Sequence, residues 1–150
     1  MSTNLDDNAP RHPLVKRAVA MLTARHASLM AILNEAEALG VVVDTSRQRI
    51  EACALQRALG AFADMEEATD TAHIPEVLKF HARRLENEET MHMTKQLLLL
   101  LKAPNPTEEP EKCFQFLETL EEEAIEKRVN VEVRAIISIV LEGGEFWEHR

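Results

Sequence analysis

Apolar residues recur at three- and four-residue intervals over most of the chain, which is the period of an amphipathic α-helix. Glycine and proline, which tend to begin or end helices, occur in a few bunches between these segments. The pattern predicts helices over residues 13–39, 45–68, 75–102 and 107–142. Because the connections between them are short, we expect an all-α fold, an antiparallel bundle of four long helices.

Local signals mark the end of the first predicted helix and the start and interior of the second. Gly40 fits the position that follows the end of the helix before it. Thr45 and Gln48 fit a capping box at the start of the second helix, with Asp44 as the competing cap. Gly60 lies inside this helix, where glycine costs about 1 kcal/mol relative to alanine. We therefore expect another helix to approach closely at Gly60.

The spacing of apolar and polar residues changes near the middle of the last predicted helix. An alternating apolar and polar run around Asn130 is typical of a strand when taken alone. A single short strand has nothing to pair with, so we expect a helix that is broken near Asn130. Gly143 and Gly144 then indicate a hinge. The predicted organisation is a disordered leader over 1–12, the helical bundle over 13–142, and a hinge with an aromatic tail over 143–150.

Charge and composition narrow the range of functions. The 150 residues carry a net charge of −9 at pH 7, with an acidic last third. This balance disfavours direct binding to nucleic acid. The longest apolar run, 97–101, is far too short to span a membrane. The two cysteines, Cys53 and Cys113, form no disulfide framework, which favours a reducing compartment and hence the cytoplasm.

The sequence carries no recognisable catalytic motif. It lacks a Ser-His-Asp order, a phosphate-binding glycine loop and a Cys-x-x-Cys pair. We therefore expect a non-enzymatic helical module that binds another protein as an adaptor, regulator or inhibitor, with a homodimer as one form of this interaction. On this interpretation the protein has no cofactor.

A run of leucines is the first candidate interaction surface. Leu97, Leu98, Leu100 and Leu101 lie at the end of the third predicted helix, which is apolar on every side there. A helix end of this kind is buried all round. It is either surrounded by its own bundle or forms a subunit interface.

Two further features of the last third suggest a partner. An acidic row that includes Glu111, Glu118 and Glu122 favours a protein with a basic surface, or else is a solvated helix face. The same row suggests, as an alternative function, an acidic decoy that occupies the nucleic-acid-binding surface of another protein. Phe146 and Trp147 are typical interface anchors, unless they fold back and plug one end of the bundle.

A second alternative function is a metal-binding bundle. Polar residues interrupt the core-facing stripe of the third predicted helix, where imidazole and carboxylate side chains share one face. Such groups on facing helices can hold a metal ion inside a bundle. The candidate ligands are His26, His81, Glu88, Glu89 and His92.

Overall fold

The computed structural model describes residues 10–40 and 44–148, and their side chains as far as residue 143. Within this part the chain forms four long α-helices and one short 3-10 helix, with no strand. They are α2 (Pro13–Ala38), α3 (Ser46–Ala68), η1 (Thr71–His73), α4 (Ile74–Leu101) and α5 (Pro110–Glu148). The predicted all-α bundle of four long helices is therefore confirmed. The predicted leader falls largely on residues 1–9, which lie outside the described residues.

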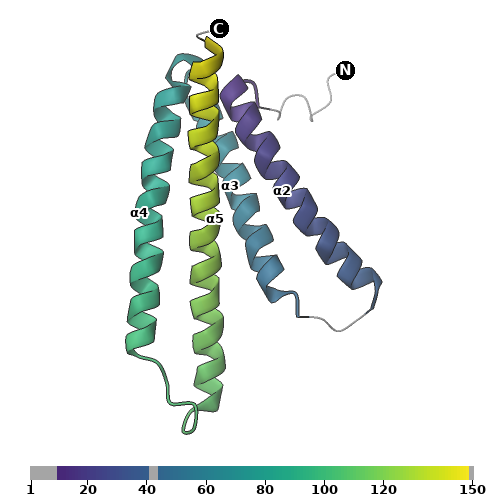
Figure 1. The fold of residues 1–150 in the computed structure, drawn as a ribbon, viewed down its shortest axis with the longest axis vertical. Helices are drawn as coiled ribbons and strands as arrows, with labels where there is room; N and C mark the ends of the chain where they lie inside the picture. Colours follow the sequence, from purple (N-terminus) through teal and green to yellow (C-terminus); the bar gives the residue numbers. More distant parts are fainter. Residues whose placement is uncertain (1–9, 41–43, 149–150) are drawn as a thin grey trace.

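The helices form two antiparallel pairs (Figure 1). α4 and α5 pack along each other, α2 packs against α3, and both α2 and α3 contact α5. The lower ends of α4 and α5 extend past the start of α3, so that α2 and α3 do not cover them (Figure 1). The molecule thus has a covered half and a protruding two-helix hairpin.

The hydrophobic core lies in the covered half. The buried side chains come from all four helices, because each helix keeps apolar residues at helical spacing on one face. His92 is the last buried residue of α4, and Ile125 is the first buried residue of α5. The segment 93–124, which the structure describes in full, contains no buried residue. The largest fully buried side chains are Phe62, Leu22, Leu55, Ile74, Leu78, Ile137, Val15, Val129, Val133 and Val140.

A buried carboxylate links three of the helices. Glu51 of α3 forms ion pairs with Arg25 of α2 and, at 3.4 Å, with Arg128 of α5. Arg25 also donates from Nε to Glu132 of α5 at 3.0 Å. Because both oxygens of Glu51 have a partner, its burial leaves no unpaired charge. The network fixes the rotation of α3 relative to its two neighbours.

The end of α2 agrees with the sequence signal at Gly40, and its start is held by hydrogen bonds that no sequence signal predicted. Backbone N–H groups of Arg11 and His12 donate to the Glu66 carboxylate at 2.8 and 3.2 Å, which holds the start of α2 beside the end of α3. His12 Nδ1 accepts a hydrogen bond from the Leu14 N–H at 3.1 Å and caps the helix. Gly40 has φ +64°, the left-handed conformation expected after a helix end.

The cap of α3 comes from Asp44 rather than from the predicted capping box. Thr45 occupies the N-cap position, but its side chain makes no capping hydrogen bond. Asp44 Oδ1 accepts from the Ser46 N–H at 3.0 Å and from the Ser46 hydroxyl. Hydrogen bonds from Ser46 lower the pKa of Asp44. A charged acceptor satisfies a free helix N–H better than a neutral hydroxyl does, so the competing cap prevails.

The predicted break near Asn130 is wrong, because α5 is one continuous helix. Val129 and Val133, four residues apart, are both buried on the core face, whereas Val131 is exposed. The alternating pattern is therefore helical spacing with an extra valine on the outer face. Asn130 itself stays helical, and its Nδ2 donates to Glu88 of α4 at 3.3 Å.

The glycines also differ from expectation. α5 continues through Gly143 and Gly144 to Glu148, where a hinge was predicted. A Cβ on Gly143 would lie 2.9 Å from Arg17 Nη1, which is the tip of a flexible side chain. A Cβ on Gly60 would meet nothing within 4 Å, and the predicted close approach there is wrong.

Candidate functional site

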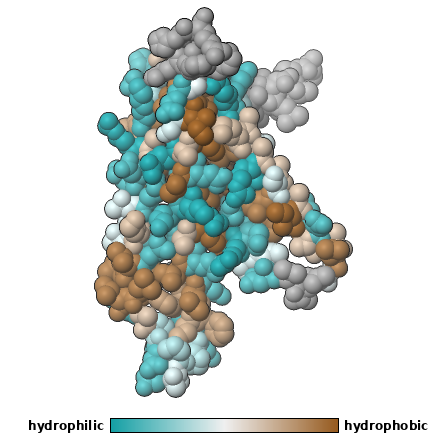
Figure 2. Space-filling view, viewed as in Figure 1, coloured by the Kyte–Doolittle hydropathy of each residue, from teal (hydrophilic) through white to brown (hydrophobic). Residues whose placement is uncertain are grey.

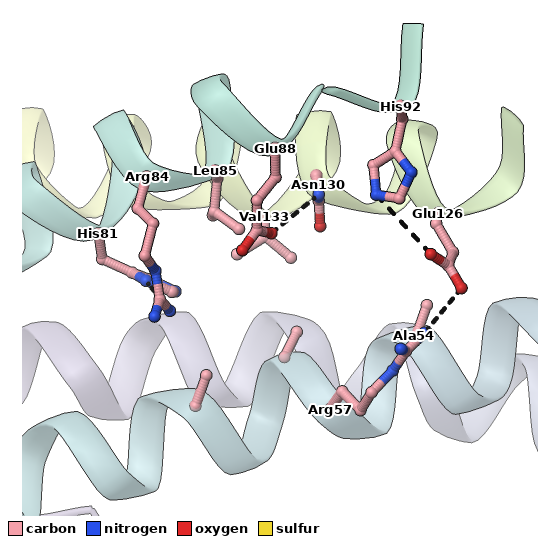
Figure 3. A pocket seen from close by; sticks show the side chains of 12 residues that line it. Ala54, Arg57, His81, Arg84, Leu85, Glu88, His92, Glu126, Asn130 and Val133 are labelled. Carbon is pink, nitrogen blue, oxygen red and sulfur yellow. Dashed lines mark hydrogen bonds and ion pairs between the residues drawn. The ribbon is translucent and has the colours of Figure 1, made fainter. Parts of the chain in front are cut away.

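A polar cavity lies between α3, α4 and α5 in the covered half of the molecule (Figure 3). Its volume is about 290 Å³. The α3 side contributes the small side chains Ala54, Ala58 and Ala61, which leave space opposite the polar stretch of α4. The charged and polar side chains that line it are Arg57, His81, Arg84, Glu88, His92, Glu126 and Asn130.

One end of the cavity holds an imidazole between two carboxylates. His92 of α4 is 8% exposed, and its Nδ1 faces the Glu123 carboxylate of α5. Its Nε2 lies 3.7 Å from Glu126 Oε2 (Figure 3). Because Glu123 and Glu126 are three residues apart, they lie on the same side of α5. One ligand atom from each of the three side chains lies within 4.8 Å of the others.

Two cations neutralise these carboxylates. Arg57 Nη2 of α3 donates to Glu126 at 3.2 Å, and Lys95 Nζ of α4 lies 3.7 Å from Glu123. The side chains of Arg57 and Lys95 are 65% and 51% exposed. Ion pairs of such exposed groups contribute little to stability and exchange readily with solvent. The cluster is therefore shielded from solvent at His92 and exposed to solvent at Arg57 and Lys95.

The other end of the cavity holds His81, which is buried and uncharged. Its Nδ1 lies 3.0 Å from Arg84 Nη2, and since a guanidinium only donates, Nδ1 accepts. The proton of the neutral ring is then on Nε2, which is buried without a partner among the described residues. Burial, and secondly the charge of Arg84, lower the pKa of His81 to about 4. The edge of the ring packs against Phe62, with the ring centres 5.7 Å apart.

The structure separates most of the five side chains that the sequence grouped as metal ligands. His26 lines a different cleft, between α2 and α3. Glu88 accepts from Asn130, and Glu89 binds Arg134 in two hydrogen bonds. His81 is engaged by Arg84 at the far end of the cavity from His92 (Figure 3).

Of the predicted ligands, His92 alone belongs to a converging set. Over 10–40 and 44–143, where side chains are described, His92 with Glu123 and Glu126 is the group whose ligand atoms meet. Glu123 and Glu126 were not among the candidate ligands predicted from the sequence, because they lie in the acidic stretch of the last helix. Their three-residue spacing was the available signal, but it could not show that this face of α5 meets His92.

The leucine run forms an exposed surface on the hairpin. Leu97, Leu98, Leu100 and Leu101 are 51–82% exposed, so the bundle does not surround them. Figure 2 shows hydrophobic residues gathered over the lower parts of α4 and α5. We call this the hairpin surface and define it as Leu97, Leu98, Leu100, Leu101, Phe114 and Leu117, each more than half exposed.

The acidic row of α5 is divided between internal and outward-facing residues. Glu121 pairs with Arg47 of α3, and Glu123 and Glu126 belong to the His92 cluster. Glu111, Glu118 and Glu122 are exposed. Their role as a docking surface for a basic partner, and the decoy function, stay predictions. The side chains of Phe146 and Trp147 lie outside those described, so the proposed interface anchors stay a prediction too.

The chain matches no protein-family model, no curated protein and no solved structure. Among the helices of the described residues, none is both long enough and apolar enough to cross a membrane.

Proposed function

We propose that the protein is a non-enzymatic interaction module whose partner is a second copy of the same chain, bound through the hairpin surface. The observation that carries this proposal is the exposure of four leucines on a hairpin whose segment 93–124 buries no residue. A helix pair gains its stability by burying an apolar face. The hairpin has such a face, and nothing in the described chain covers it.

The size of the hairpin surface suits an interface. Six large apolar side chains, each more than half exposed, present roughly 600 Å², which is the upper end of the largest patch on a typical monomer. A standard interface buries about 800 Å² on each partner. The hairpin surface with its polar border therefore covers the area that a stable dimer needs.

The charge pattern limits how a second copy can bind. The segment 93–103, which is the end of α4 and the two residues after it, contains two lysines and no acid. The segment 108–126, which is the start of α5 and the two residues before it, contains eight acids and one lysine, so the hairpin as a whole is negative. A twofold arrangement that places α4 of one copy against α5 of its partner opposes unlike charges, keeps the two acidic segments apart and completes a four-helix bundle from two hairpins.

We also propose a cellular compartment for the module, on the evidence of its cysteines. Cys53 and Cys113 are free thiols, with no disulfide between them. Free thiols persist in a reducing environment. We therefore place the module in the cytoplasm, where a partner with a basic surface could also use the exposed acids of α5.

The test is the oligomeric state of paired variants. Leu98→Glu with Leu101→Glu places charges in the hairpin surface, and Ile32→Glu is the matched control because Ile32 of α2 is 55% exposed and Leu98 is 51% exposed. We expect a dimer for the wild type and for Ile32→Glu, and a helical monomer for the double variant, by light scattering and circular dichroism. A wild type that stays monomeric at about 100 µM would contradict the proposal, since such an interface gives micromolar affinity or better. Dissociation by Ile32→Glu alone would instead place the contact on α2.

A further inference from the structure

We propose that His92, Glu123 and Glu126 bind one divalent transition-metal ion, of the Zn²⁺ and Mn²⁺ class. The ligand atoms of these side chains already lie within 4.8 Å of one another. His92 is nine-tenths buried, with Nδ1 towards Glu123 and Nε2 towards Glu126, so the ion takes one ring nitrogen and the carboxylate at the other nitrogen turns towards the ion. This site is independent of the self-association proposed above, because all of its ligands come from one chain.

The donor set selects the kind of ion. One imidazole nitrogen and two carboxylate oxygens suit Zn²⁺, Mn²⁺ and Fe²⁺. Ca²⁺ and Mg²⁺ prefer oxygen ligands alone, in larger number or with ordered waters. Two carboxylates and a neutral imidazole carry two negative charges, which a divalent ion balances.

The cavity gives the ion room for its remaining ligands. His92 and Glu126 line the 290 Å³ cavity, which is large enough for several waters. Glu88 lines the same cavity, where its carboxylate accepts a hydrogen bond from Asn130.

The cations that now face the carboxylates can leave. Arg57 lines the cavity and Lys95 lies on α4, and more than half of each side chain is exposed. Both can turn into solvent at small cost when an ion neutralises Glu126 and Glu123. The ion replaces two weak, exposed ion pairs with bonds to a buried imidazole and two half-buried carboxylates.

The position of the site gives the ion a structural consequence. His92 is the last buried residue of α4 and Ile125 the first buried residue of α5, so the ligands lie where the core ends and the hairpin begins. An ion there joins α4 to α5 at the base of the hairpin. Because it binds the folded chain, it raises the melting temperature as ion concentration rises.

The experiment is a titration of tag-free protein with ZnCl₂ and MnCl₂, followed by calorimetry and by thermal melting, with CaCl₂ as the control ion. Glu123→Gln and Glu126→Gln each remove one ligand charge. Glu122→Gln makes the same change at the neighbouring, exposed position of α5 and is the matched control. We expect one ion per chain, an affinity at least about tenfold weaker in both ligand variants, and no loss in Glu122→Gln.

A second measurement distinguishes the loss of a metal ligand from poor folding of a variant. Co²⁺ bound by the wild type should show visible d–d absorption, and this spectrum should change in His92→Gln while circular dichroism confirms the fold. Binding weaker than about 1 mM, or equal weakening by Glu122→Gln, would overturn the site. The double variant Leu98→Glu with Leu101→Glu should retain the ion as a monomer, so failure of self-association and failure of metal binding are distinguishable.

Discussion

Arg134 of α5 binds Glu89 of α4 through two parallel hydrogen bonds, from Nε to Oε2 at 2.7 Å and from Nη2 to Oε1 at 2.9 Å. Glu89 is buried, and the hydrogen bonds to it raise the pKa of Arg134. A planar guanidinium matches a carboxylate in this two-bond geometry, which fixes the relative position of the two helices. The pair also explains why Glu89 does not belong to the His92 cluster.

Replacing Arg134 by lysine should destabilise the fold although the charge is kept. Lysine offers a point charge and cannot make both hydrogen bonds, so one oxygen of buried Glu89 loses its partner. We expect a loss of about 1–2 kcal/mol in the free energy of unfolding, measured by urea denaturation. Arg83→Lys, at an exposed position of α4, is the control and should stay within about 0.5 kcal/mol of wild type. Equal effects of the two changes would contradict the role of the pair.

His81 should make stability depend on pH. Its pKa is about 4 in the folded protein because burial and the charge of Arg84 disfavour the proton. In the unfolded chain the pKa is near the ordinary value of about 6.5. Between these values the unfolded state binds more protons, so the free energy of unfolding rises with pH across this window. The stabilisation is complete above about pH 6.5 and is lost as the pH falls towards 4.

The variant His81→Leu isolates this effect. Leucine does not titrate and leaves no buried N–H without a partner, so its stability should fall less on acidification. We expect the difference between wild type and variant to change by about 2 kcal/mol between pH 6.5 and 4, after allowance for residual solvent screening. The change His73→Leu, at an exposed position, should leave the wild-type slope intact. Parallel pH curves for wild type and His81→Leu would refute the assignment.

Helix positions were predictable from the sequence because local rules set them. The end of α2 was found because Gly40 adopts the left-handed conformation that glycine favours. The break near Asn130 was wrong because three valines at alternate positions look like a strand, and only tertiary packing shows that Val129 and Val133 alone face the core.

The candidate site was only half predictable. The polar interruption on the third predicted helix included His92, since that signal lies within one element. Its partners Glu123 and Glu126 depend on how α4 and α5 align, and helical periodicity gives the faces of a helix but not its register against a neighbour. For the same reason, the sequence did not show that Arg134 of α5 binds Glu89 of α4.

Two glycine substitutions should have opposite effects. Gly60→Ala fills open space on a helix, so it should stabilise the protein by about 0.5–1 kcal/mol. Gly40→Ala forces a side chain into φ +64° and should destabilise it by about 1 kcal/mol. Thermal unfolding of both variants in parallel checks the sign of each change. A destabilising Gly60→Ala would mean that another chain packs at this position.

Hydrogen exchange should separate the hairpin from the covered half of α5. Because residues 93–124 bury no side chain, their helical hydrogen bonds are opened by local fluctuations in a monomer. We expect amides of 111–121 to exchange at least about tenfold faster than amides of 129–140 in the Leu98→Glu, Leu101→Glu variant. In the wild type at high concentration the second copy should slow exchange at 111–121, while exchange at 14–30 of α2 stays unchanged as the internal control. Uniform protection along α5 in the monomeric variant would show that the hairpin is stable by itself and needs no partner.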